Sequence, residues 1–261
     1  MTIQDKFSAL KANGEKALVC FFTAGDQSLE DLPKIVSYLT ENGADVIEIG
    51  LPFSDPFGEG PTIQDSSQRS LENGTTLTKV LDAIAECRIA IPLVTMGYFN
   101  PILRFGLDKF AAKSKEVGVT GTIVSDLVPD EANVWDEVCE QEDLETIYLV
   151  APTSTSERIQ QVTNQSTGFV YVVSRTGVTG AESAVPIEIS SLVKKVKDLT
   201  HKPVCVGFGI STPEHVRLVC KEADGAVVGS GIVTMLHKHW NNLDERHLIG
   251  EYVRSLKDAT V

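Results

Sequence analysis

Short apolar runs recur along the whole chain, and each of them ends in glycine, proline or small polar residues typical of turns. Several runs are rich in valine and isoleucine, as strands buried on both faces should be. We predict eight buried strands, over residues 17–23, 46–50, 92–96, 121–125, 146–150, 168–173, 203–206 and 226–228.

The segments between these runs carry apolar residues at helical spacing. In the first of them, over residues 29–39, Ser28 is the predicted N-cap and Gly43 the predicted C-terminal stop. Further helices are predicted over residues 77–90, 107–117, 129–141, 156–165, 187–199 and 213–223, with an extra helix before the first strand (2–13) and a closing helix (243–257).

Strand and helix alternating eight times in about 250 residues is typical of a closed (β/α)8 barrel, the TIM barrel. The rival fold is an open doubly wound sheet, which usually has fewer strands and a GxGxxG motif after the first. That motif is missing here, because Thr23 is followed by Ala24, Gly25 and Asp26. No linker or abrupt change of composition interrupts the chain. We therefore expect residues 1–261 to form one α/β barrel domain with an extra N-terminal helix.

Composition fits a globular enzyme and narrows the choice of partners. The chain is 42% hydrophobic and 23% charged, which is ordinary for such a protein. Its 23 basic and 36 acidic residues give a formal net charge of −13, which argues against nucleic acid and anionic membranes as partners. A small phosphorylated ligand remains compatible with this charge, because backbone amides bind phosphate locally.

Cysteine usage and the apolar runs bear on location. The five cysteines are scattered and form no CxxC pair, which indicates reduced thiols in a cytosolic protein. The first residues show no secretory signal pattern, and no apolar run approaches the length of a membrane span. We expect a cytoplasmic protein.

One carboxylate, Glu48, lies near the end of the apolar run 46–50, just before a loop dense in proline, glycine and acid. An acid inside an apolar strand is costly to bury unless the protein uses it. Because side chains alternate along a strand, Glu48 lies opposite Ile47 and Ile49 and should point into the cavity that the strand lines. Glu59, on the following loop, could swing over that cavity. One fixed and one mobile carboxylate suggest acid–base chemistry on a bound small molecule.

The active site of a TIM barrel lies at the carboxyl ends of its strands. Two glycine clusters, at residues 207–211 and 229–231, follow the last two predicted strands. Glycine lets backbone N–H groups approach a phosphate closely, and a helix N-terminus adds a favourable dipole. We therefore predict a phosphate site there. The long loop over residues 174–182, rich in glycine and threonine, is predicted to be a lid.

Other candidate residues have less support. Asp126 ends the fourth predicted strand and is either an acid of the site or a cap for a loop. The histidines lack metal-ligand spacing with a second ligand nearby, which favours surface or structural positions, and no metal is expected. No GxSxG elbow and no Cys–His motif is present, so nucleophilic catalysis has little support.

Several of these segments together resemble the signatures of a known family. The sequences IEIGLPFSDP (47–56) and GPTIQ (60–64) are similar to the signature of the tryptophan synthase α subunit, and so is SRTGVTGA (174–181). GFGIS (207–211) and the pair at 229–230 resemble its phosphate-binding turns. The similarity runs in order through nearly the whole chain, and the two longest motifs are specific.

This resemblance implies a lyase that cleaves indole-3-glycerol phosphate to indole and glyceraldehyde 3-phosphate by a retro-aldol reaction. Glu48 matches the family's catalytic glutamate, which acts first as an acid and then as a base. Glu59 stands where the family usually has an aspartate that hydrogen-bonds the indole N–H. The carboxylate is kept, but its stem is longer by one methylene, and a misplacement of about 1 Å can cost on the order of a hundredfold in rate.

Further roles are implied by the same resemblance. Thr179 matches a residue that contacts the second loop when the site closes, while Pro52 and Asp55 match positions at the interface with a β subunit. That partner uses pyridoxal phosphate and receives indole through a channel, whereas this chain itself is implied to need no cofactor. The implied walls of the indole pocket are Phe21, Met96, Tyr98, Ile123, Leu149, Tyr171 and Phe208. The implied phosphate donors are Gly180, Gly209, Gly229 and Ser230.

Three hypotheses for the function remain. The first is a lyase inside an α2β2 complex with the β subunit. The second is a regulatory subunit that binds the phosphate ligand and activates its β partner while cleaving poorly, and the replacement at Glu59 motivates it. The third is an independent lyase that releases free indole.

Overall fold

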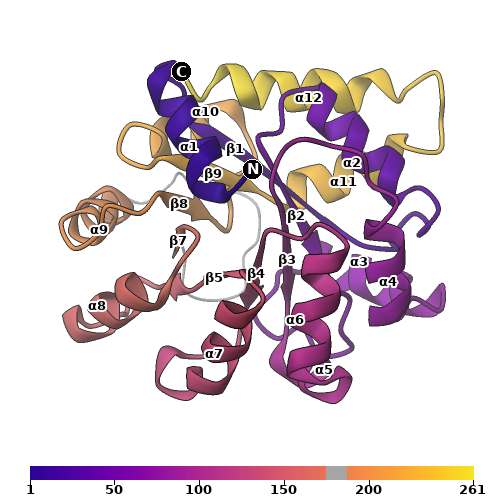
Figure 1. Ribbon diagram of the computed structural model, residues 1–261. Helices are drawn as coiled ribbons and strands as arrows, with labels where there is room; N and C mark the ends of the chain where they lie inside the picture. Colours follow the sequence, from indigo (N-terminus) through magenta and orange to yellow (C-terminus); the bar gives the residue numbers. More distant parts are fainter. Residues whose placement is uncertain (175–186) are drawn as a thin grey trace.

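The computed structural model describes residues 1–174 and 187–261, and its strands form a parallel sheet that curls into a barrel (Figure 1). The strand order is β5-β4-β3-β2-β1-β9-β8-β7-β6. Because β5 and β6 are consecutive in the chain, the two ends of the sheet meet. The strands are β1 (Ala17–Thr23), β2 (Val46–Gly50), β3 (Leu93–Gly97), β4 (Gly121–Val124), β5 (Glu145–Ile147), β6 (Leu149–Val150), β7 (Val170–Val173), β8 (Val204–Gly207) and β9 (Gly225–Val228).

The predicted TIM barrel is therefore confirmed, with one difference in the fifth strand. The predicted strand 146–150 is divided into β5 and β6 at Tyr148. The Tyr148 N–H donates to the Ser166 hydroxyl at 3.3 Å rather than to a neighbouring strand. The Tyr148 phenol is buried and hydrogen-bonds the Asp136 carboxylate. A strand whose backbone donates to a side chain loses its regular ladder at that point.

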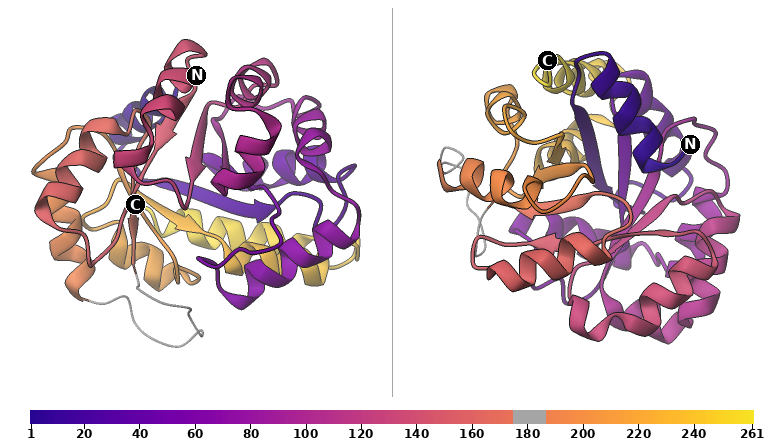
Figure 2. Two further views of the ribbon diagram at one scale, coloured as in Figure 1. Left: turned by 90° about the horizontal axis from the view of Figure 1, so that it is seen from below. Right: turned by 60° about the vertical axis from the view of Figure 1, so that its left-hand side comes forward.

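Helices surround the barrel on its outside (Figures 1 and 2). The extra N-terminal helix α1 and the closing helix α12 are present as predicted. The helices are α1 (Ile3–Ala12), α2 (Leu32–Glu41), α3 (Pro61–Glu72), α4 (Leu77–Ile84), α5 (Phe99–Phe105), α6 (Leu107–Glu116), η1 (Pro129–Glu131), α7 (Asn133–Gln141), α8 (Ser156–Gln165), α9 (Ile187–Lys197), α10 (Pro213–Val219), α11 (Ser230–His239) and α12 (His247–Asp258).

The start of α2 differs from the prediction. The N-cap is Asp31 rather than Ser28, and the Ser28 hydroxyl instead hydrogen-bonds Asp31 in the preceding turn. The end of α2 agrees with the prediction, since Gly43 follows the C-cap with a φ of +115°. Three helices, α3, α5 and α11, were not among those predicted.

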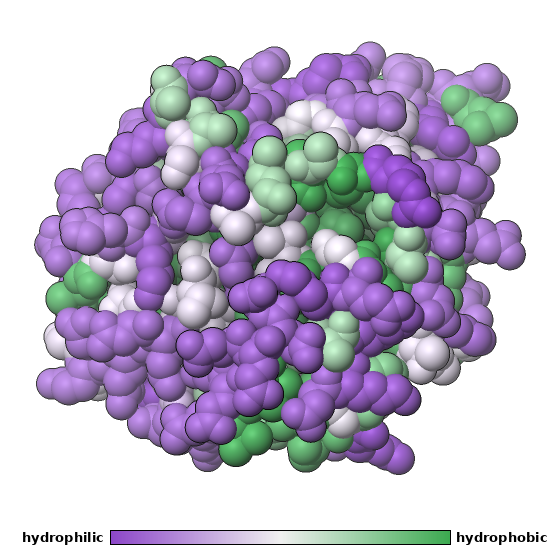
Figure 3. Space-filling view, in the orientation of Figure 1, coloured by the Kyte–Doolittle hydropathy of each residue, from purple (hydrophilic) through white to green (hydrophobic). Residues whose placement is uncertain are grey.

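Helix α1 covers the end of the barrel at which the strands begin. The Ile3 side chain lies close to Gly121 and Gly168, and the Ile3 N–H donates to the Glu145 carboxylate at 3.1 Å. A side chain at either glycine would press against Ile3. This end is in front in Figure 3, where hydrophilic residues cover most of the rim around smaller apolar areas. The opposite end, where the strands finish, is left for the site. No helix within the described ranges is long and apolar enough to cross a membrane.

Candidate functional site

Glu48 lies inside the barrel, as predicted. In the parallel register it is paired with Phe21 of β1 and Val94 of β3. Paired residues of a sheet point to the same face, so Glu48 shares the interior with Phe21. Glu48 is 1% exposed, and neither of its carboxylate oxygens has a hydrogen-bond partner among the described residues.

Burial without a partner changes the acidity of Glu48. Removal from water disfavours the charged form and, together with the smaller effect of the Glu59 carboxylate, raises the pKa of Glu48 to about 8. The same Glu48 charge contributes to the raised pKa values of Tyr171 and Cys205, which lie on neighbouring strands β7 and β8. Glu48 is thus protonated at neutral pH and can donate a proton.

Glu59 approaches the same interior from the loop between β2 and α3, called loop two here (residues 51–60). Its side chain is half-buried, and burial raises its pKa to about 7. Its backbone is held in place on both sides. The Glu59 N–H donates to Pro56 O at 3.0 Å, and the Gln64 side-chain amide donates to Glu59 O at 2.8 Å. Only the side chain of Glu59 therefore has freedom to move without breaking a backbone hydrogen bond.

Tyr98 is the residue onto which loop two docks. The Gly58 N–H donates to the Tyr98 hydroxyl at 3.1 Å. The rings of Phe53 and Phe57 lie 5.2 and 5.3 Å from the Tyr98 ring. Burial and then the Glu59 charge raise the pKa of the Tyr98 phenol. Tyr98, implied as a wall of the ligand pocket, is thus also the support of loop two.

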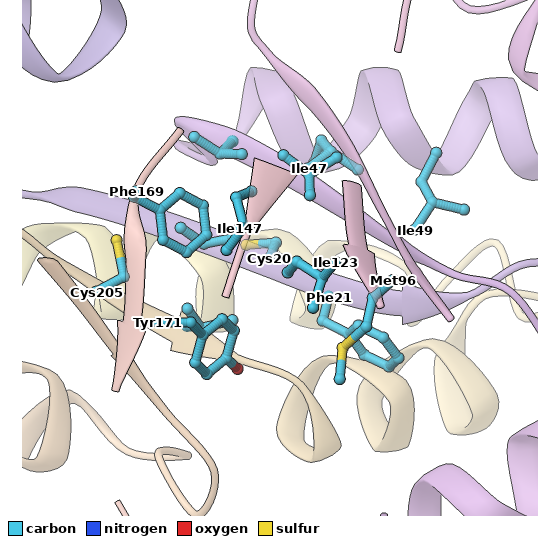
Figure 4. Close-up of a cluster of buried hydrophobic side chains, with 14 of the residues drawn as sticks. Cys20, Phe21, Ile47, Ile49, Met96, Ile123, Ile147, Phe169, Tyr171 and Cys205 are labelled. Carbon is cyan, nitrogen blue, oxygen red and sulfur yellow. The ribbon is translucent and has the colours of Figure 1, made fainter. Parts of the chain in front are cut away.

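A pocket opens below loop two, and it contains several of the implied residues. Phe21, Met96, Tyr98 and Glu59 line it together. Ile123 and Tyr171 lie close by on the same inner face, and Figure 4 shows these side chains converging from separate strands. Among the remaining implied wall residues, Leu149 and Phe208 are half-buried against the core. The other residues that line the pocket are Thr23, Gly50, Leu51, Pro56, Ile63, Ser67, Gly97 and Ser125.

The predicted phosphate turns follow β8 and β9, which are neighbours in the sheet. Phe208 and Gly209 both have positive φ, at 68° and 81°, which is a turn that favours glycine. Gly229 is the N-cap of α11 and Ser230 its first residue, and no side chain of the described residues caps that end. The first N–H groups of α11 thus lack a helical partner. Gly180 and Thr179 lie outside the described residues.

A close approach in the same region explains one further glycine. A side chain at Gly207 would overlap the Tyr171 hydroxyl, whose ring packs edge-on against Phe208 with 5.8 Å between centroids. Ser174, at the end of β7, donates its hydroxyl to Phe208 O. The pocket wall and the phosphate turn are therefore joined through Tyr171 and Phe208.

Loop one (residues 24–31) follows β1 at the end of the barrel where the site is expected, whereas α3 is not among the predicted elements. The Thr23 hydroxyl lies 2.6 Å from the Ser66 hydroxyl of α3, and Arg69 of α3 forms an ion pair with Asp26. The signal in the sequence was Gly60-Pro61, since proline is favoured in the first turn of a helix. The buried side of α3 is mainly serine, which a search for apolar periodicity does not detect.

The structure separates other candidates from the pocket. The Asp126 carboxylate accepts the Phe99 N–H at 2.7 Å, which makes it a cap for the start of α5. Of the two implied interface positions, Asp55 is exposed and Pro52 half-buried, both on loop two.

The chain is similar to proteins of one family along nearly its whole length. The family model described as tryptophan synthase alpha chain matches residues 7–260. The tryptophan synthase alpha chain of Geobacter sulfurreducens is 45% identical over 259 residues, which are 98% of each chain. That of Thermoanaerobacter sp. is 42% identical, with the same coverage of both chains.

Solved structures agree with this relationship. A structure of Mycobacterium tuberculosis tryptophan synthase superposes with a TM-score of 0.90 at 35% identity, over 99% of this chain and 97% of that one. The tryptophan synthase alpha chain of Legionella pneumophila gives a TM-score of 0.89 at 33% identity, over 100% and 97% of the two chains. The chain described here therefore belongs to the tryptophan synthase alpha chain family.

Proposed function

We propose that this chain cleaves indole-3-glycerol phosphate to indole and glyceraldehyde 3-phosphate, with Glu48 as the acid and base. Membership of the family makes the chain a carbon–carbon lyase of tryptophan biosynthesis. The observation that supports the role of Glu48 is its burial: the residue is 1% exposed, and its carboxyl group has no hydrogen-bond partner within residues 1–174 and 187–261. A group kept there at the cost of desolvation is explained by use in the reaction.

The chemistry requires one proton to be delivered and one to be removed. Protonated Glu48 gives its proton to indole C3, which produces an indolenine and leaves Glu48 as a carboxylate. The C3′ hydroxyl then loses its proton to Glu48 while the C3–C3′ bond breaks and its electron pair returns to the indole ring. Glu48 ends protonated as it began. A pKa of about 8 is suited to both steps near neutral pH.

Glu59 has the complementary role in this proposal. The indole nitrogen becomes positively charged in the indolenine, and a carboxylate that accepts its N–H stabilises that charge. Glu59 lines the pocket, and its pKa of about 7, below that of Glu48, makes it the first of the two acids to ionise as the pH rises. One acid protonated and the other ionised is the arrangement that such a reaction needs.

Binding follows from the two sides of the site. The apolar walls around Phe21 and Met96 suit an indole ring. The uncapped start of α11 at Gly229 and Ser230, with the turn at Gly209, suits the phosphate, because free N–H groups and the helix dipole attract an anion. Thr179 and Gly180 remain predicted as the closure residue and a further phosphate donor.

We also propose a tryptophan synthase β subunit as the partner, in an α2β2 complex. The supporting feature is the exposure of large apolar side chains in the segments that follow β2, β3 and β4. Phe57 of loop two is 64% exposed although it packs on Tyr98, and Leu103, Val128 and Val134 are exposed as well. In a parallel barrel these segments leave the sheet at the same end, and large apolar side chains exposed there indicate a protein contact. Pro52 and Asp55 belong to the same loop.

The purified chain should be assayed with synthetic indole-3-glycerol phosphate, alone and with a β subunit. We expect measurable cleavage alone and a clear increase with β. Equal cleavage in both samples would favour an independent lyase that releases indole. Activation of β without measurable cleavage, even at high enzyme concentration, would favour a regulatory subunit and contradict the proposed reaction.

A further inference from the structure

Helix α3 packs against the barrel in an unusual way. Its buried residues are Ile63, Ser66, Ser67 and Ser70, so only one of the four is a large apolar side chain. Serine contributes little hydrophobic free energy on burial, whereas its hydrogen bonds are directional. Contacts of this kind fix the position of a helix along its axis more than they stabilise it.

Three polar contacts form a row along α3, about one turn apart, and their partners are successive residues from the end of β1 into loop one. Ser66 hydrogen-bonds the Thr23 hydroxyl at 2.6 Å, and Ser70 donates to Ala24 O at 2.6 Å. Asn73, just after the helix, donates to Gly25 O at 3.2 Å. The row is completed by the ion pair of Arg69 with Asp26.

That ion pair has two hydrogen bonds. Arg69 Nε donates to one Asp26 oxygen at 2.6 Å, and Arg69 Nη2 donates to the other at 3.1 Å. The Asp26 side chain is 6% exposed and that of Arg69 31%. A two-pronged guanidinium–carboxylate pair fixes direction as well as distance.

Loop one fits closely against α3 only because of a glycine. Gly25 has a φ of +77°, and a side chain there would overlap the hydroxyls of Ser70 and Thr75. Any sideways shift of α3 would therefore break several of these contacts together.

The start of α3 carries the second carboxylate of the proposed site. Glu59 is followed directly by the N-cap Gly60, and both Ile63 and Gln64 donate backbone N–H groups to Gly60 O at 3.0 Å. The Gln64 side chain also donates to Glu59 O. The Glu59 backbone is thus a rigid extension of α3, so its place over the pocket depends on where α3 sits.

We propose that Asp26 and Arg69 are a positioning pair, which sets the place of the Glu59 carboxylate relative to Glu48 by fixing α3 against loop one. The inference rests on the proposed function only for the chemistry assigned to Glu59, because the mechanical connection does not depend on the reaction. Neither residue lines the pocket that contains Glu59. Their effect on catalysis would be exerted through Glu59.

The test uses the full chain with Arg69→Gln, which removes the charge and the two-pronged contact. Arg69→Lys keeps the charge but removes the paired hydrogen bonds of the guanidinium group. The double variant Asp26→Asn with Arg69→Gln avoids a buried unpaired carboxylate. Arg158→Gln is the matched control. It breaks an Arg158–Asp130 pair between α8 and η1, and its arginine is 33% exposed, much like Arg69.

We expect Arg69→Gln and the double variant to lower kcat about tenfold or more, with KM changed less than about threefold. Arg69→Lys should recover part of the loss, and Arg158→Gln should match the wild type. In parallel, Glu48 is titrated by NMR on chains carrying labelled glutamate, with Glu48→Gln and Glu59→Gln used for assignment. The Glu48 titration in Arg69→Gln should shift toward that of Glu59→Gln, because the neighbouring charge has moved away.

The two readouts separate the two claims. Folded Arg69→Gln and double variants with wild-type kcat and a wild-type Glu48 titration would overturn the positioning role and leave the lyase proposal intact. Equal cleavage by the wild type and Glu48→Gln would overturn the proposed acid–base role, while the titration would still decide whether Arg69 positions Glu59. A loss of stability without any shift in the Glu48 titration would also contradict the positioning role.

Discussion

Two buried carboxylates, Asp45 and Glu48, stand three residues apart, one just before strand β2 and the other in its middle. Asp45 precedes β2 and is 5% exposed. It accepts hydrogen bonds from Lys257 at 2.8 Å and from the Leu18 N–H at 3.0 Å, and it forms an ion pair with Lys6 at 2.9 Å. Glu48 is buried more deeply, and the described part of the chain offers it no such partner.

The Asp45 carboxylate has positively charged and N–H partners on several sides. Lys257 also pairs with Glu15 at 2.8 Å and donates to Lys16 O at 3.3 Å. This network joins α1, β1, β2 and α12 at the end of the barrel where the strands begin. The charged group that perturbs Glu48 most is instead another carboxylate, Glu59. The start of β2 is thus built for stability, whereas its middle and the loop that follows are built for chemistry.

The largest expected effect tests the catalytic role of Glu48. Glu48→Gln keeps the shape of the side chain but removes the exchangeable acid, so cleavage of indole-3-glycerol phosphate should fall by about a hundredfold to ten-thousandfold. Binding of the ligand should survive, as measured by titration calorimetry. Cleavage that stays near the wild-type rate would show that Glu48 is not the acid and base, and the contrast with Asp45 would then have no catalytic meaning.

The second effect tests the stabilising network around Asp45. Asp45→Asn leaves Lys6 and Lys257 without their shared carboxylate, and breaking a buried ion pair costs on the order of 3 kcal/mol. We expect the free energy of unfolding, measured by urea titration, to fall by about that amount. Cleavage per folded molecule should be unchanged. A variant as stable as the wild type would show that the network at this end contributes specificity rather than stability.

Glu48 and Asp45 also differ in how far the sequence predicts their positions and partners. The bounds of β1 and β2 match the prediction, because continuous apolar runs end sharply at polar residues or at glycine and proline. The position of Glu48 inside the barrel follows from strand alternation alone. Its lack of partners does not, since that depends on what neighbouring strands place beside it.

The network at Asp45 lies beyond sequence reasoning for a different reason. Lys257 and Asp45 are 212 residues apart, and only the closed barrel brings them together. Helix α3 was missed because its buried face is serine, which carries no apolar period. Helix α11 was missed because its start, Gly229 and Ser230, was interpreted as a phosphate turn, and the helix that begins there was not recognised.

The pH dependence of stability gives a third effect. The pKa of Glu48 is raised from 4.5 to about 8, so the folded state keeps a proton that the unfolded state has lost. Its contribution to stability is therefore full below about pH 4.5 and is lost as the pH rises through about 8, with a slope of at most about 1.4 kcal/mol per pH unit. Urea titrations of the wild type and Glu48→Gln across this range should diverge accordingly. Parallel curves would mean that Glu48 is not protonated in the folded chain, whereas Asp45→Asn should leave the divergence unchanged.

The smallest effect concerns the neighbour that distinguishes Glu48 from Asp45. Glu59→Asp shortens the side chain by one methylene on a backbone held by Pro56 and Gln64. Its carboxylate would move about 1 Å without a change in the loop, a distance that matters for catalysis. The family signature that the sequence resembles usually has aspartate at this position. We therefore expect the rate of cleavage to be kept or raised a few-fold, measured as kcat for indole release. A collapse of the rate would instead show that loop two is adapted to the longer acid, and that the site requires a glutamate at both position 48 and position 59.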